Sequence, residues 1–493
     1  SIMESTGNGE LGTYQTTSNG CPVSDNNHSM TAGPRGPILL QDFTLIDKLA
    51  QFDREVIPER VVHAKGAGAH GYFICTKDVT MYTKADFLSE IGKKTPTFLR
   101  FSTVGGEKGS ADTERDPRGF ALKFYTEEGN YDMVGNNTPV FFIRDPIKFP
   151  EFIHTQKRDP INNCKDPNMA WDFWTKHTEA LHQVMILFSS RGTPDGYRHM
   201  NGYSSHTFKW VNKDGKAFYV KKHFKTDQGI KNLDAGQAHR LKAENPDYAT
   251  KDLFDAIENG DYPSWTLKVQ IMPEEDAETY EWDIFDITKV WPHKDYPLIE
   301  IGKLVLDKNP KNYHVEVEQS AFSPSHLVPG IEPSNDKMLQ GRLFSYPDTH
   351  RHRLGPNYHN IAINCPYRVK TRDYFLAGPF AVDKEGTEKK PYQGKFNDHP
   401  KECPEAETKK ISLVGEAGRY EYSHPNSDFA QPAALYNNVF DEEEQANLVQ
   451  NLADHIGGCR EEIRKAAIEV WSQVDEKLGK KLAMKIKSQN FGN

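Results

Sequence analysis

The chain has 493 residues, of which 27% are charged and 37% are hydrophobic. This length suffices for about three domains of ordinary size, and the composition is typical of a folded globular protein rather than a disordered one. The formal net charge of -9 argues against a nucleic-acid-binding protein, and no apolar run is long enough to span a bilayer.

Six cysteines are scattered along the chain without a CxxC pair. This pattern favours reduced thiols in an intracellular protein over a disulfide framework or a zinc site. The first residues are polar and lack the apolar core of a signal peptide, so secretion is not expected. The last residues do not form a Ser-Lys-Leu peroxisomal address, so the compartment stays open.

The N-terminal region predicts an arm. Residues 1–36 are rich in Ser, Thr, Asn and Gly and predict an extended or disordered tail. Residues 39–52 predict a helix, because Leu45, Ile46, Leu49 and Phe52 recur on one side.

Residues 60–310 predict many short strands separated by turns. In residues 97–104 the period of two places Phe98, Arg100, Ser102 and Val104 on one face. Further strands are predicted at residues 61–63, 140–143, 206–210, 218–220 and 265–271, with a helical insertion at 170–187. Many strands in one region favour a closed barrel, since closure removes exposed edges.

The C-terminal part changes character twice. Residues 310–430 are irregular apart from a predicted helix at 337–354, and such a long stretch is expected to wrap over something or to connect subunits. Residues 437–493 predict a pair of helices, interrupted at Gly457 and Gly458.

Residues 342–353 (RLFSYPDTHRHR) carry the first candidate site. Arg342, Tyr346, His350 and Arg353 share one helical face, because they are spaced by four, four and three. An arginine one turn from a tyrosine favours the phenolate, which is a suitable ligand for a ferric ion. The same spacing also occurs on ordinary surface helices, so the residues alone leave this alternative open.

Residues 52–69 (FDREVIPERVVHAKGAGA) carry the second candidate site. His63 follows two valines, and the small residues after it permit close approach of other groups. Ser102 could orient this imidazole by a hydrogen bond. A lone histidine in such a setting is more often a core residue than a catalyst.

Asn136 offers an amide donor, although Gly-Asn-Asn more often forms a turn. His350 and His352 make a poor metal pair.

At this point the chain closely resembles the haem-containing monofunctional catalases of the small-subunit type. The resemblance covers residues from about 20 to 490 and rests on both motifs above, together with RFSTV at 100–104, RDPRGF at 115–120 and WPHKDYPL at 291–298. It implies an enzyme that disproportionates hydrogen peroxide to water and dioxygen. Haem b is the expected cofactor, and tyrosine ligation is the known catalase case.

The resemblance also implies residue roles. His63 is expected to be the distal acid–base with Asn136 as its partner, Ser102 to hold the imidazole, and Tyr346 to be the proximal iron ligand. Arg342 is expected to stabilise the phenolate. The haem propionates and ring are expected to contact Arg60, Arg100, Arg353 and Phe149. The approach channel is expected to be lined by Val104, Asp116 and Phe142.

A second ligand, NADPH, is implied by some members of the family. The matching positions are His182, Ser189, Arg191, Asn201, Lys225, Trp291 and His293. Arg, Lys and His suit phosphate recognition. Ile186 is a departure, because some members that bind NADPH carry an aromatic residue there.

The implied fold is an α+β arrangement around an antiparallel eight-stranded barrel. The expected parts are an N-terminal arm (1–64), the barrel (65–309), a wrapping segment with the proximal helix (310–425) and a helical domain (426–493). The family forms tetramers in which the arm and the wrapping segment interlock. It occurs in peroxisomes and in bacterial cytoplasm, so an intracellular homotetramer without nucleic-acid or membrane partners is expected.

Two alternatives stay open from the sequence. One is a lipid-hydroperoxide lyase or synthase of the same fold, which the presence of Asn136 and the channel residues disfavours. The other is a haem store or a peroxide sensor without enzymatic activity.

Overall fold

The computed structural model describes residues 13–382 and 390–489. The chain divides into two compact units. The described part of the first consists of residues 13–59 and Val382, and the second begins at Arg60 and contains the barrel and the remaining helices.

Eight antiparallel strands of the described chain close into a barrel, which confirms the predicted fold class. The ring runs in the order β7-β5-β4-β3-β2-β1-β9-β8 and closes because β8 pairs with β7. Two short strands, β6 and β10, extend the sheet beside β7. The strands are β1 (Gly66–Cys75), β2 (Lys94–Ser102), β3 (Gly119–Thr126), β4 (Gly129–Asn136), β5 (Gly202–Tyr203), β6 (Phe208–Val211), β7 (Ala217–Thr226), β8 (Ser264–Pro273), β9 (Ile299–Lys308) and β10 (Ile331–Pro333).

Strand register brings distant polar residues into one row. Ser102 of β2 pairs with Gly119 of β3, and Gly119 pairs with Asn136 of β4. Arg100 lies two residues before Ser102, so its side chain points to the same face of the sheet. Residues 102 and 136 are therefore neighbours only because β3 lies between their strands.

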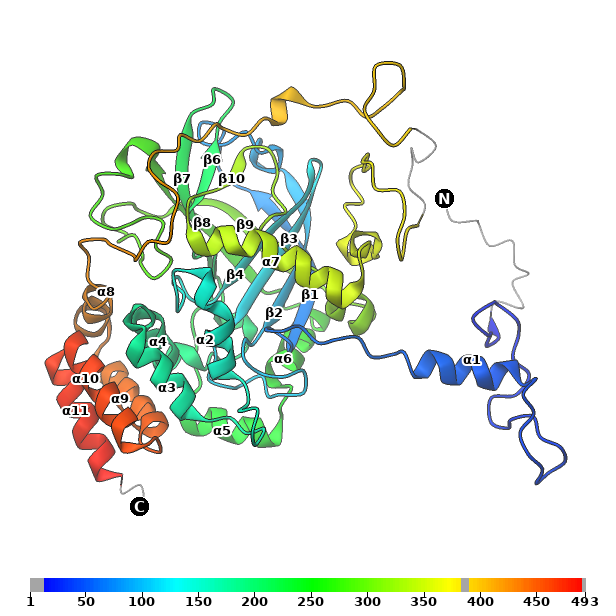
Figure 1. The fold of residues 1–493 in the computed structure, drawn as a ribbon, viewed down its shortest axis with the longest axis horizontal. Helices are drawn as coiled ribbons and strands as arrows, with labels where there is room; N and C mark the ends of the chain where they lie inside the picture. Colours follow the sequence, from blue (N-terminus) through cyan, green and yellow to red (C-terminus); the bar gives the residue numbers. More distant parts are fainter. Residues whose placement is uncertain (1–12, 383–389, 490–493) are drawn as a thin grey trace. The chain divides into compact units, whose positions relative to one another are not determined.

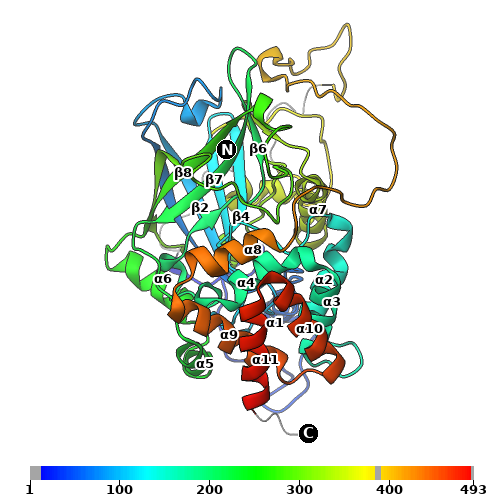
Figure 2. The same ribbon diagram turned by 90° about the vertical axis from the view of Figure 1, so that its left-hand side faces the viewer.

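The helices occupy the connections and the C-terminal region (Figure 1). They are α1 (Phe43–Phe52), α2 (Phe149–Gln156), α3 (Pro167–Lys176), α4 (Leu181–Phe188), α5 (Ala235–Glu244), α6 (Tyr248–Glu258), α7 (Lys337–Leu354), α8 (Ala430–Ala434), α9 (Glu442–Ile456), α10 (Glu461–Val474) and α11 (Glu476–Ser488). Helices α8 to α11 gather beside α3 and α4 (Figure 2), and their apolar faces share one hydrophobic core. Trp171 and Trp471 are fully buried in this core.

Helix α7 has the bounds predicted from the sequence and continues through Pro347. Asp336 caps it by accepting a hydrogen bond from the Leu339 backbone N–H at 3.1 Å. Such a cap satisfies one of the backbone donors that the first turn leaves without a partner.

Several local predictions are wrong. Residues 61–63 are not a strand, because His63 has a left-handed φ of 64° and β1 begins only at Gly66. Residues 140–143 are irregular, and their apolar character reflects burial, since Phe142 packs on Phe152 and Trp174.

Three helix predictions also need correction. The insertion at 170–187 is two helices, α3 and α4, separated by a short turn. The expected C-terminal pair is three helices, because Asp475 ends α10 and its carboxylate caps α11 by accepting from the Leu478 N–H at 2.9 Å. The arm helix begins at Phe43, four residues later than expected.

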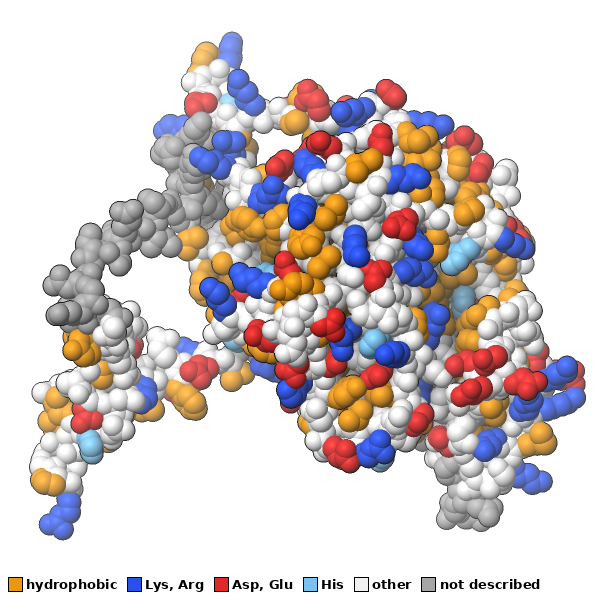
Figure 3. All heavy atoms as spheres, turned by 180° about the vertical axis from the view of Figure 1, so that it is seen from behind, with side chains coloured by type: hydrophobic (Ala, Val, Ile, Leu, Met, Phe, Trp, Pro, Cys, Tyr) orange, Lys and Arg blue, Asp and Glu red, His pale blue; other side chains and the backbone are white. Residues whose placement is uncertain are grey.

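Surface charge shows no concentration of one sign on the face seen in Figure 3, where acidic and basic side chains are interspersed. This distribution agrees with the modest net charge of -9. No helix among the described residues is long and apolar enough to cross a membrane.

Candidate active site

Two adjoining cavities lie between the barrel and α7. One has a volume of about 200 Å³ and the other about 530 Å³, and both are lined by His63, Phe149 and Tyr346. The larger volume is ordinary for a site that holds a small molecule or a cofactor. The two motifs singled out in the sequence therefore face the same space, although they are nearly three hundred residues apart.

On the barrel side, His63 is held by the row of strand residues described above. Its Nδ1 lies 2.8 Å from Ser102 Oγ, which confirms the predicted hydrogen bond. The His63 backbone N–H donates to the Val104 carbonyl at 3.0 Å, and the left-handed φ turns the side chain into the cavity. Asn136 and Val104 line the same smaller cavity.

Burial keeps this imidazole neutral. Burial, together with repulsion from the guanidinium groups of Arg100, Arg342 and Arg60, lowers the His63 pKa from 6.5 to about 3. Desolvation and like charges both disfavour the protonated ring. His63 can therefore accept a proton over the whole neutral range.

On the helix side, Tyr346 takes part in a chain of polar contacts. An Arg342 Nη donates to Tyr346 Oη at 2.8 Å, and the other Nη lies 2.6 Å from His206 Nε2. His206 Nδ1 lies 2.7 Å from the Asp336 carboxylate. Since arginine can only donate, His206 accepts at Nε2 and donates from Nδ1 to Asp336. Burial lowers the His206 pKa, which agrees with this neutral tautomer.

The rim of the larger cavity carries an excess of positive charge. Arg60, Arg100 and Arg353 are at most 9% exposed, and Glu318, at 1%, is the buried carboxylate among them. Burial and the other two guanidiniums lower the Arg60 pKa well below its ordinary value. One guanidinium nitrogen of each arginine is buried without a hydrogen-bond partner.

This rim fits an anionic ligand. Three guanidiniums against one carboxylate leave a formal excess of two positive charges, which a pair of carboxylates on a ligand would neutralise. Haem carries two propionates, so the residues present fit the cofactor expected from the sequence. Phe149, the first residue of α2, lines both cavities and offers a ring for stacking.

Two of the predicted channel residues, Phe142 and Asp116, do not line either cavity. Phe142 is in the core against Phe152 and Trp174, whereas its neighbour Phe141 lines the smaller cavity. Asp116 accepts hydrogen bonds from the backbone N–H groups of Val104 and Gly105 at 2.6 and 2.7 Å. Its carboxylate therefore holds the loop after β2, and burial raises its pKa.

A separate cavity of about 540 Å³ collects most of the predicted NADPH residues. Its lining includes His182, Ser189, Arg191, Lys225, Trp291 and His293, as well as Ile186. Asn201 does not line it. The Asn201 amide instead donates to Tyr203 Oη at 3.0 Å and accepts from the Thr226 N–H at 2.9 Å. Asn201 therefore holds Tyr203, which lines the cavity.

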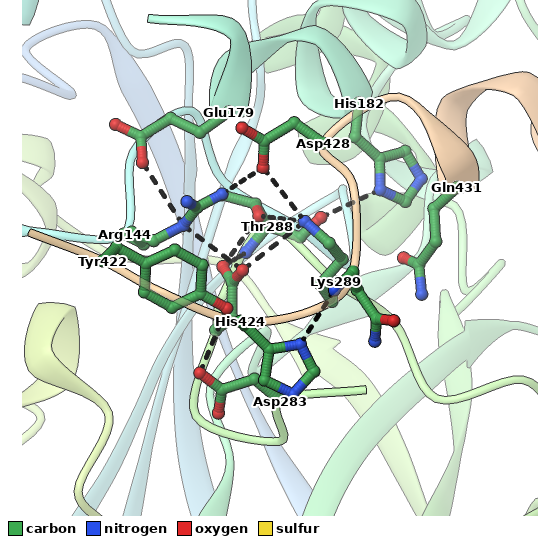
Figure 4. A network of polar contacts seen from close by, with 12 residues as sticks. Arg144, Glu179, His182, Asp283, Thr288, Lys289, Tyr422, His424, Asp428 and Gln431 are labelled. Carbon is green, nitrogen blue, oxygen red and sulfur yellow. Dashed lines mark hydrogen bonds and ion pairs between the residues drawn. The ribbon is translucent and has the colours of Figure 1, made fainter. Parts of the chain in front are cut away.

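One side of this cavity is anchored by a polar network (Figure 4). Arg144 contacts the carboxylates of Glu179, Asp286 and Asp428 and lies 3.9 Å from the Tyr422 ring centroid. These contacts hold the irregular segment before α8 against the connecting segments that carry Arg144, Glu179 and Asp286. His182 Nδ1 lies 3.0 Å from the Thr288 carbonyl and donates to it, and burial lowers the His182 pKa to about 4.

Sequence reasoning missed four residues of the main site: His206, Asp336, Gly119 and Glu318. A Cβ at Gly119 would lie 2.2 Å from Ser102 Oγ and 2.7 Å from His63 Nδ1, so only glycine leaves room for their hydrogen bond. Gly119 lies in the RDPRGF motif at 115–120 but was given no role there, and the other three residues lie outside the quoted motifs. A pairing of the strands from sequence would have been needed to find Gly119.

A neutral imidazole facing a phenol across a cavity with an anion-binding rim defines a cofactor-dependent oxidoreductase built on a closed barrel. Comparisons with known proteins then give the family. A catalase family profile matches residues 16–399, and a catalase-related immune-responsive profile matches residues 423–486.

The chain is 57% identical to a peroxisomal catalase of Toxoplasma gondii over 97% of this chain and 96% of that protein. It is 58% identical to catalase-A of Dictyostelium discoideum over 95% of each. Among solved structures, catalase A from Saccharomyces cerevisiae superposes with a TM-score of 0.93, at 48% identity over 96% of this chain and 99% of the other.

The chain belongs to the catalase family, and its reaction is the decomposition of hydrogen peroxide. The family implies a haem cofactor. The lyase and the non-enzymatic alternatives are therefore set aside.

Proposed function

We propose that His63 is the distal acid–base, that Tyr346 is the proximal iron ligand, and that the cofactor between them is haem b. The observation that carries this proposal is that both side chains line the same pair of cavities. Arg60, Arg100 and Arg353 would hold the propionates, and Phe149 would stack on the ring. When bound, the haem supplies the redox chemistry by which one peroxide is reduced to water and another is oxidised to dioxygen.

The residues of the chain supply proton transfer and orientation. The neutral His63 ring accepts a proton from one peroxide oxygen and returns it to the other, while the Asn136 amide donates to the departing oxygen. Ser102 holds the imidazole at Nδ1 throughout, at 2.8 Å. Arg342 donates to Tyr346 Oη and stabilises a phenolate, and Asp336 holds His206 behind it.

Substitution of His63 by alanine tests the proposal. We expect the variant to retain haem, because neither the arginine rim nor Tyr346 changes, and to lose dioxygen evolution by about 10²- to 10⁴-fold, the usual contribution of a positioned acid–base group. Dioxygen release per haem and the absorption spectrum are the measurements. Near-native turnover with intact haem would contradict the role given to His63.

The cavity around Arg191 and Lys225 supports a second proposal, that the chain binds NADPH. Six of the seven expected residues line one cavity, and basic side chains there suit phosphate groups. Replacement of Arg191 by alanine should weaken binding in a fluorescence titration with NADPH, whereas the same change at Arg240, an exposed residue of α5, should not. Equal affinities for both variants would contradict the proposal.

We further propose a small-subunit homotetramer in which the arm and the 310–425 segment contact other subunits. Large apolar side chains are exposed in each: Leu49 and Phe52 in the arm, at 52% and 66%, and Phe375 and Phe396 in the segment, at 71% and 93%. Exposed apolar groups of this kind mark association surfaces. Light scattering that gives a monomer mass would contradict the proposed tetramer.

The name of the Toxoplasma relative supports an intracellular, peroxisomal location if the source is a eukaryote.

A further inference from the structure

Two histidines outside the active site face one another edge to edge. His326 Nε2 and His359 Nε2 are 3.2 Å apart, and the ring centroids are 5.3 Å apart at an interplanar angle of 57°. His326 follows the π turn at His314–Glu318, and His359 lies in the short turn at Tyr358–Asn360 after α7. Neither residue takes part in the peroxide chemistry.

The first histidine is oriented from behind by a buried carboxylate. His326 Nδ1 lies 2.7 Å from Asp132 Oδ2, and the Asp132 backbone N–H donates to the His326 carbonyl at 2.9 Å. Asp132 is 1% exposed and also binds Lys123 Nζ at 2.8 Å, so the negative charge is held in place and the lysine charge is countered. Because a carboxylate only accepts, the His326 proton is on Nδ1 and the Nε2 lone pair points outward.

The second histidine is accessible. His359 is exposed, and its ring stacks on the buried Tyr358 with centroids 4.1 Å apart. Stacking on Tyr358 restricts rotation of the His359 ring. The pair therefore combines an imidazole that a buried carboxylate orients with a second imidazole on an exposed residue.

The separation of the two nitrogens matches a shared metal ion. Two imidazoles bound to one tetrahedral ion at about 2.0–2.1 Å have their ligating nitrogens roughly 3.3 Å apart. The observed 3.2 Å is close to this value, and it also allows a long N–H···N hydrogen bond. A carboxylate on the far nitrogen of a ligating histidine is the usual support of a metal site.

We propose that His326 and His359 bind one divalent transition-metal ion, of the class of Cu²⁺, Ni²⁺ or Zn²⁺, with Asp132 orienting the first ligand. Imidazole nitrogen suits these ions and not Ca²⁺ or Mg²⁺. Within the described ranges no group of three or more His, Cys, Asp or Glu is arranged to hold a metal, so the remaining positions around the proposed ion would be filled by water. On binding, the proton of His359 moves to Nδ1 and its Nε2 lone pair enters the coordination sphere.

Such an ion would join two segments next to the proximal helix. His350 of α7 donates from Nε2 to the Phe322 carbonyl at 2.9 Å, four residues before His326. Tyr358 also contacts the His350 ring, with centroids 5.7 Å apart. The ion would thus restrain the loop and the turn that flank α7, and its binding should raise the thermal midpoint of the folded enzyme.

The test uses the full chain in its cofactor-loaded form, stripped of loosely bound metal with a chelator. Equilibrium dialysis against Zn²⁺, followed by elemental analysis, should give one Zn²⁺ per chain beyond the iron. His359→Gln should reduce the Zn²⁺ affinity at least tenfold, because the exposed side chain is lost without disturbing the core. The matched control is His239→Gln, an exposed histidine on α5, which should bind as the native chain does.

A spectroscopic measurement gives a second readout that does not depend on the Zn²⁺ affinity. Electron paramagnetic resonance of the native chain with one added Cu²⁺ should show coupling to two imidazole nitrogens, and His359→Gln should show one or none at this site. Equal Zn²⁺ affinity in the native and His359→Gln chains, or a Cu²⁺ spectrum that this substitution leaves unchanged, would overturn the proposal.

Discussion

Substitution of Gly119 by alanine probes how finely the barrel positions His63. A Cβ there would lie 2.2 Å from Ser102 Oγ and 2.7 Å from His63 Nδ1. Real Cβ atoms do not approach other heavy atoms closer than 3.0 Å, so the hydroxyl and the imidazole must both move and their 2.8 Å hydrogen bond must break or lengthen. A misplacement of about 1 Å in a catalytic group can lower a rate about 10²-fold, or about 2.7 kcal/mol in the barrier.

The assay is dioxygen evolution per haem over a range of peroxide concentrations. We expect Gly119→Ala to lose about 10²-fold in kcat while its haem content stays native, because the arginine rim and Tyr346 are unaffected. Gly109→Ala is the control, since its added methyl group meets no atom within 4 Å. Activity of Gly119→Ala within twofold of the control would refute the claim that this hydrogen bond positions the base.

Three more predictions follow from the same geometry. With a His63 pKa of about 3, kcat/KM should be flat from about pH 5 to about pH 8 and fall only in stronger acid, and an acid limb near 6.5 would count against a neutral buried base. The free energy of unfolding should fall as the pH drops from 6.5 toward 3. In this range the unfolded chain binds protons at its histidines, whereas buried His63, His223 and His350, each with a pKa of about 3, stay neutral in the folded chain. An acid titration followed by circular dichroism measures this change. Tyr346→Phe should weaken haem retention or shift its absorption band, and an unchanged spectrum at full occupancy would exclude phenolate ligation.

The sequence alone determined the features that are local along the chain. Helix α7 was predictable with its bounds, because Asp336 and Gly355 are cap residues and the four-residue spacing of Arg342 and Tyr346 puts them in contact wherever the helix lies. The barrel was predictable as a fold class, since many short strands in one sheet would leave exposed edges unless the sheet closes. The family motifs then identified His63 and Tyr346 as residues to examine together.

Only the tertiary structure decided what depends on pairing between distant segments. Strand register places Gly119 between Ser102 and Asn136, and it shows why a glycine is needed at a position to which the sequence analysis gave no role. The strand prediction at His63 was wrong because its backbone is left-handed. Long-range contacts override the β propensity of the two preceding valines. His206 reaches Arg342 from a different part of the chain, and such contacts leave no periodic trace because they are set by how the segments pack in space.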